Sequence, residues 1–116
     1  MDILDAEDPT DAIARIRSGP HVPMPPPETA HASGGPGKGM TIENGTGYTL
    51  RVHFSGPVNR TVDVTDGQSA DVELAVSSYE VAAEVPGAPV TPFYGRQTYE
   101  PNFHYWLKFF VEWKYR

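Results

Sequence analysis

The stretch from Leu74 to Val85 constrains the fold of this chain most strongly, because apolar and polar residues alternate along it. One face collects the apolar side chains of Tyr79, Val81, Ala83 and Val85. The other face collects Glu80, Ala82 and Glu84. A period of two is typical of a half-buried β-strand. Because Tyr79 follows a short corner, we expect its ring to fill the edge of a core while its hydroxyl binds backbone in the turn.

The same alternation predicts further short strands from Met40 to the C-terminus. Residues 40–43 are expected to form a short edge strand, and residues 48–54 form the clearest run, with His53 on its solvent-facing side. Turn signals such as Asn44-Gly45 and Asp66-Gly67 separate the runs. Strands of this length and spacing predict an all-β fold, an immunoglobulin-like antiparallel β-sandwich of about seven strands. The predicted core consists of Tyr48, Leu50, Val52, Phe54, Val62, Val64, Val72, Leu74, Tyr79, Val81, Val85, Leu107, Phe109 and Val111.

Before the sandwich, residues 1–39 are predicted to form an extended N-terminal arm with one short helix at about residues 9–18. Asp8 is placed to cap this helix, Pro9 suits its first position and Gly19 ends it. Ile13 and Ile16 share one face. Two turns with two isoleucines are too little to fold alone, so the helix requires a surface to pack against.

Residues 19–39 are a Pro/Gly-rich linker, with six prolines and five glycines. The first half, which includes Pro23, Met24, Pro25, Pro26 and Pro27, favours an extended polyproline conformation, and the glycine-rich second half is typical of a flexible tether. We predict that the arm binds a partner through Ile13, Ile16 and residues 23–27; the alternative is a solvated tail. The domain division expected from this pattern is 1–39 for the arm and 40–116 for the sandwich.

The C-terminal run from Tyr105 to Trp113 has two unequal faces. Tyr105, Leu107 and Phe109 belong to the core stripe, whereas Trp106 and Phe110 stand among charged residues on the other face. Two large aromatic side chains among charges require cover. The sequence leaves open whether the arm or loops of the same chain supply that cover or whether a partner does.

The runs Val64-Thr65-Asp66-Gly67-Gln68-Ser69, Val72-Glu73-Leu74 and Tyr79-Glu80-Val81-Ala82-Ala83 resemble the core of carboxypeptidase regulatory-like and transthyretin-like sandwich domains. In those domains a glycine-containing turn, an apolar strand and a Pro-Gly-x-Tyr corner follow one another. This chain has Val76-Ser77 where that corner carries Pro-Gly. The resemblance covers roughly residues 40 to 113 and implies an accessory or adhesive role without catalysis, and it carries no functional residue over to this chain.

Charge and composition limit the partners and the compartment. The net charge is −6, and the chain from Met40 onward is also acidic, so a nucleic-acid partner is not expected. The sequence shows no transmembrane segment and no leader at Met1. A native start at Met1 therefore predicts a cytoplasmic protein, and a removed leader predicts an extracytoplasmic one. The absence of cysteine excludes disulfides and thiolate metal sites.

No residue pattern indicates a catalytic centre or a cofactor. The histidines lack a metal-site spacing, and the serines lie in turn sequences. A copper site from His21, Met24, His31 and Met40 is a minor alternative, since imidazole and thioether suit that metal. Asn44-Gly45-Thr46 and Asn59-Arg60-Thr61 match the glycosylation pattern.

These observations favour a non-catalytic structural or accessory subunit. We expect it to bind a protein partner, or to assemble with itself or into a larger complex, through the N-terminal arm and the sandwich surface. The alternative is a ligand-binding module for carbohydrate or metal that uses exposed aromatic residues such as Tyr94, Tyr99 and Trp106.

Overall fold

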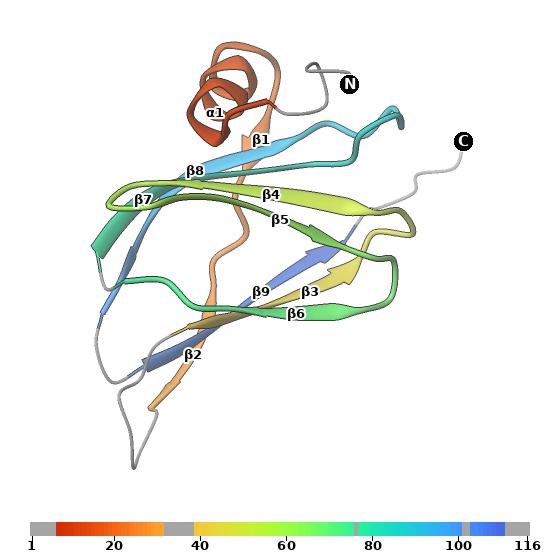
Figure 1. Cartoon of the computed structure of the whole chain (residues 1–116). Coiled ribbons are helices and arrows are strands. Elements are labelled where there is room, and N and C mark those ends of the chain that lie inside the picture. Colours follow the sequence, from red (N-terminus) through yellow and green to blue (C-terminus); the bar gives the residue numbers. More distant parts are fainter. Residues whose placement is uncertain (1–6, 32–38, 76, 101–102, 111–116) are drawn as a thin grey trace.

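The computed structural model describes residues 7–31, 39–75, 77–100 and 103–110. Within these ranges the chain forms one helix and nine strands, arranged in two mixed β-sheets (Figure 1). In chain order the elements are α1 (Pro9–Ser18), β1 (Val22–Pro23), β2 (Glu28–His31), β3 (Met40–Gly45), β4 (Leu50–Ser55), β5 (Asn59–Val64), β6 (Ser69–Val72), β7 (Ser77–Glu84), β8 (Phe93–Tyr99) and β9 (Phe103–Phe110).

The two sheets form two layers that face each other. The five-stranded sheet has the order β1-β8-β7-β4-β5, and the four-stranded sheet has the order β2-β9-β3-β6. The predicted mostly β fold is confirmed. The prediction of purely antiparallel pairing is wrong, because β1 pairs with β8 and β3 pairs with β9 in parallel. Nor is β3 an edge strand, since it lies between β9 and β6. Alternation assigns each strand a buried face, but it does not choose the strand's neighbours.

The hydrophobic core fills the space between the two layers. Every predicted core residue that the structure describes belongs to it, with Tyr48 and Val62 at its margin; Val111 lies outside the described residues. The core also contains Met40, Ile42 and Tyr99, which were not predicted, and Ala83 and Tyr105, which the alternation had placed on apolar faces. The expected bond between the Tyr79 hydroxyl and the backbone of the preceding turn is confirmed, because this hydroxyl donates to the Ala75 carbonyl at 2.8 Å.

Helix α1 has the predicted bounds and caps. The Asp8 side chain accepts a hydrogen bond from the Thr10 amide at 2.9 Å, and the Gly19 amide donates to the Ile16 carbonyl. The helix lies on the outer face of the five-stranded sheet (Figure 1), where Ile13 and Ile16 pack against Ala82 of β7. The surface that this short helix requires therefore belongs to the same chain. No helix in the described ranges has the length and apolar character needed to cross a membrane.

The N-terminal segment also supplies an edge strand to each sheet. Strand β1 lies beside β8, and β2 pairs antiparallel with β9. The amide of Val22 donates to the carbonyl of Pro92, just before β8, at 2.9 Å, and the amide of Met24 donates to the carbonyl of Tyr94 in β8 at 3.0 Å. Pro23 between them has no amide proton, and at this sheet edge none is needed. Residues 22–31 therefore join the sandwich rather than extend away from it.

Candidate functional site

A polar network lies between α1 and the five-stranded sheet. His53 of β4 is on the outer face, as predicted, but it is not solvent-facing, because α1 covers this face and leaves its side chain 2 % exposed. Its Nε2 lies 2.7 Å from Oε2 of Glu84, and its Nδ1 lies 2.9 Å from the Thr61 hydroxyl. A carboxylate only accepts hydrogen bonds, so Nε2–H donates to Glu84.

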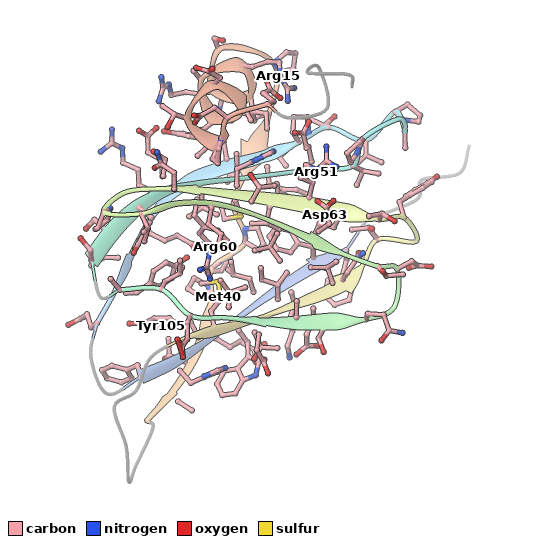
Figure 2. The ribbon with its side chains drawn as sticks, in the orientation of Figure 1. Arg15, Met40, Arg51, Arg60, Asp63 and Tyr105 are labelled. Atoms are coloured by element: carbon pink, nitrogen blue, oxygen red, sulfur yellow. The ribbon has the colours of Figure 1, made fainter. Side chains whose placement is uncertain are left out.

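The network continues from the sheet into the helix. Arg15 of α1, labelled in Figure 2, donates to both carboxylate oxygens of Glu84, at 3.0 and 3.1 Å, and also binds Glu7. The hydrogen bond from His53, together with the one from Arg15, lowers the pKa of Glu84 despite its burial. Arg15 likewise holds the pKa of Glu7 below its usual range. Glu84 thus ties α1 to β4 and β7.

A second ionic contact forms in the same last turn of the helix. Arg17 forms an ion pair with Glu80 of β7, which also accepts a hydrogen bond from the Tyr94 hydroxyl at 2.6 Å. The bonds from Tyr94 and Arg17 lower the pKa of Glu80. Both helix contacts therefore stabilise the ionised carboxylates.

The chain of hydroxyl, imidazole and carboxylate formed by Thr61, His53 and Glu84 contains the groups that transfer protons in some enzymes. Here the imidazole and the carboxylate are covered by α1, and both ring nitrogens are already bonded within the protein. The imidazole side chain is 2 % exposed with the helix in place. We interpret this network as the attachment of α1 rather than as a catalytic centre.

The outer face of the four-stranded sheet, called the open face below, differs because the described part of the chain places no helix over it (Figure 1). The residues of this face alternate with core residues of β3, β6 and β9. It comprises Glu28, Thr41, Glu43, Ser69, Asp71, His104, Trp106, Lys108 and Phe110. The open face therefore combines three rings with charged groups of both signs.

Phe110 occupies one end of the open face and is 65 % exposed. Its ring lies over Gly45 of the neighbouring strand, so close that a Cβ at this glycine would come within 2.8 Å of the ring. A hollow of about 320 Å³ adjoins the ring and is also lined by Glu43 and Gln68. Gly45 is therefore what allows an exposed aromatic ring to lie flat at this end of the sheet.

A second hollow, of about 540 Å³, lies at the opposite end of the open face. Asp71, Glu73 and His104 line it from β6, the segment after β6, and β9. Arg60 reaches it from β5, between the two layers (Figure 2), and donates to the Glu73 carbonyl at 3.1 Å. Both hollows have mixed linings, and this one carries more charged groups, because Arg60, Asp71 and Glu73 stand beside Met40 and Val72.

The structure distributes the sequence-predicted partner residues over two environments. Ile13 and Ile16 are buried between α1 and β7. Pro23 lies in β1, and Met24 packs on the core. The carbonyl of Pro25 accepts a hydrogen bond from Gln97 at 3.3 Å. Pro26 is exposed and Pro27 half-buried, just before β2. Trp106 and Phe110 both lie on the open face.

Two minor sequence signals involve residues that the fold buries, Met40 and Asn44. Met40 is a core residue, so the copper alternative loses one of its ligands, and the described residues contain no cluster of His, Asp and Glu that could hold a metal ion. Asn44 is buried, and its side chain donates to the Tyr48 and Val64 carbonyls at 2.6 and 2.8 Å, which fixes the turn after β3. That arrangement is structural and leaves this asparagine no room for a glycan.

Sequence reasoning missed both hollows. Their walls come from strands that are distant in the chain, and only the turn residues near Gly67 and the glycine before Met40 gave any local signal. Comparison with family models, with curated proteins and with solved structures finds no match to this chain. The function is therefore argued from the open face alone.

Proposed function

We propose that this protein is a non-catalytic accessory domain that binds a partner protein through the Phe110 end of the open face. One observation carries the proposal: a phenylalanine that is 65 % exposed lies over a glycine at the rim of a hollow. A large aromatic group at the margin of a concave surface is typical of the anchor residues of protein interfaces.

The charges beside Phe110 indicate what the partner presents. Lys108 forms an ion pair with Glu28 at 3.2 Å, whereas the Glu43 carboxylate has no ion-pair partner among the described residues. A partner segment with an apolar side chain against Phe110 and a basic side chain near Glu43 is complementary to this end of the face. The net charge of −6 also favours a basic partner segment.

The proposal differs from the expectation that the N-terminal arm makes the contact. The apolar residues of the helix are buried against β7, and β1 and β2 are paired with β8 and β9. Binding of a partner by those residues would first require breaking these contacts. The open face requires no such rearrangement, so we assign partner binding to it.

The resemblance to carboxypeptidase regulatory-like and transthyretin-like domains, and the immunoglobulin-like description of the fold, are part of the proposal. They are supported by the two-layer arrangement and by the corner at which Tyr79 donates to Ala75. Such domains are mostly attachments to other proteins, which agrees with an accessory role.

The test compares two exposed apolar residues in the tagged full chain, isolated from the cells that produce it. Phe110→Ser removes the anchor, whereas Val58→Ser changes a residue that is 48 % exposed in the connection between β4 and β5. We expect the same partner protein to be recovered with the wild type and with Val58→Ser. The recovered amount of that partner should fall at least about tenfold with Phe110→Ser. Glu43→Lys should reduce recovery as well, by repelling a basic segment. Equal recovery with Phe110→Ser and the wild type would contradict the proposal.

A further inference from the structure

The polar hollow at the far end of the open face is separate from the Phe110 end. His104 and Phe110 are six residues apart on β9, a distance of about 20 Å at roughly 3.4 Å per residue. The hollow's volume of about 540 Å³ lies within the range of small-molecule sites. It therefore requires an explanation of its own.

A glycine at the start of β3 opens this hollow. Gly39 stands in the row between Glu73 and His104, and it has a positive φ of 100°. A Cβ at this position would lie 3.0 Å from the Val72 carbonyl oxygen. This position therefore favours glycine, and no side chain at residue 39 occupies the hollow.

The polar wall is held in place by hydrogen bonds within the protein. The Thr41 hydroxyl donates to Oδ1 of Asp71 at 2.7 Å, and it lies 2.8 Å from Nε2 of His104. Because the hydroxyl's only proton points to Asp71, Nε2–H of His104 donates to the hydroxyl. This arrangement leaves Oδ2 of Asp71 and, in the neutral imidazole, Nδ1 of His104 as acceptors.

Arg60 adds donors to the same wall. One of its guanidinium nitrogens donates to the Glu73 carbonyl, and the planar group has further N–H donors in a fixed geometry. Since Arg60 and the hydrogen-bonded side chains of Thr41, Asp71 and His104 are already positioned, a ligand does not have to order them on binding.

One ring, that of His104, lines the hollow. It packs against Trp106 with centroids 4.5 Å apart and planes inclined by 59°, so Trp106 supports the imidazole from outside the hollow. A ring next to paired acceptors and donors matches a molecule that has one apolar C–H face and a rim of hydroxyl groups.

We propose that this hollow binds a neutral saccharide unit whose adjacent hydroxyls contact Asp71, Glu73 and Arg60 while its C–H face lies toward the ring of His104. The lining carries two carboxylates and one guanidinium, so it disfavours an anionic ligand. It also lacks the clustered ligands of a metal site within the described residues. A neutral polyhydroxylated ring satisfies both conditions.

The experiment follows backbone amide shifts of the isotope-labelled full chain during titration with cellobiose, maltose, lactose and mannobiose, and with glucuronate as the anionic probe. We expect a saturable shift with at least one neutral disaccharide, centred on Gly39, Asp71, Glu73 and His104. Asp71→Ala or Glu73→Ala should weaken binding at least about tenfold, because each removes an acceptor for a hydroxyl. Asp11→Ala, which removes an exposed carboxylate on α1, is the matched control and should bind as the wild type does.

Three results would overturn the proposal: no saturable shift with any neutral disaccharide, shifts centred elsewhere, or unchanged binding in both hollow variants. A response to glucuronate alone would do so as well. Phe110→Ser should leave saccharide binding unchanged, since Phe110 does not line this hollow. The outcome is thus independent of the partner-binding test.

Discussion

The outer faces of the two sheets are built from the same kind of alternating sequence but differ in what covers them. On the five-stranded sheet α1 buries His53 and Ala82, and every polar group beneath it is paired. On the four-stranded sheet Phe110 is exposed, and Glu43 has no ion-pair partner in the described part of the chain. The difference teaches that the same polar alternation gives different environments depending on cover: beneath the helix the polar residues attach α1 to the sheet, whereas on the open face they stay accessible for the binding proposed above.

The largest expected effect comes from weakening the covered face. Ile13→Ala should lower the free energy of unfolding by about 3 kcal/mol, because it removes buried methyl groups between α1 and β7. Phe110→Ala, on the open face, should change it by less than about 0.5 kcal/mol. Urea unfolding measures both values. Equal losses in the two variants would remove the contrast between the faces.

The second effect concerns the carboxylate that links α1 to the sheet. Glu84→Gln should cost about 2 kcal/mol at neutral pH, because His53 and Arg15 lose a charged acceptor. The folded-state pKa of Glu84 is lowered from 4.5. Its stabilisation is therefore complete above that value and is lost as the pH falls through the lowered pKa.

Urea unfolding of the wild type and of Glu84→Gln, measured from neutral pH down to about pH 3, tests this sign. The gap between the two proteins should shrink in acid. A gap that stays constant over the whole range would show that ionisation of Glu84 does not hold the helix.

A smaller effect is expected at the glycine beneath the Phe110 ring. Gly45→Ala places a Cβ within 2.8 Å of the ring and 3.2 Å from the Phe109 carbonyl oxygen. The exposed ring can turn away, so the free energy of unfolding should fall by no more than about 1 kcal/mol. Recovery of the partner protein should fall with it, because the anchor is displaced. Retained recovery would mean that the position of the ring does not matter for binding.

The smallest effect is expected at the exposed ion pair of the open face. Lys108 and Glu28 lie 3.2 Å apart, and their side chains are 36 % and 67 % exposed. A double-mutant cycle with alanine should give a coupling of about 0.3 kcal/mol that decreases with added salt. A coupling above about 1 kcal/mol would place this pair in the same class as the helix attachment.

The sequence alone predicted those features that depend on local chemistry. The caps of α1 at Asp8 and Gly19, the core positions along β4 and β7, and the hydroxyl bond of Tyr79 follow from residues within a few positions of each other. A side-chain period of two identifies the buried face of each strand before its neighbours are known.

Only the tertiary structure decided which strands are neighbours and what lies over each outer face. The placement of α1 turned His53 from an expected solvent-facing residue into a buried one, and the parallel pairing of β3 with β9 brought Gly39 and Gly45 beside opposite ends of the aromatic row. The pairing of β3 with β9 joins residues 65 positions apart in the chain, such as Met40 and Tyr105. Alternation on one strand contains no information about such partners, because sheet order and cover are set by packing of the whole core.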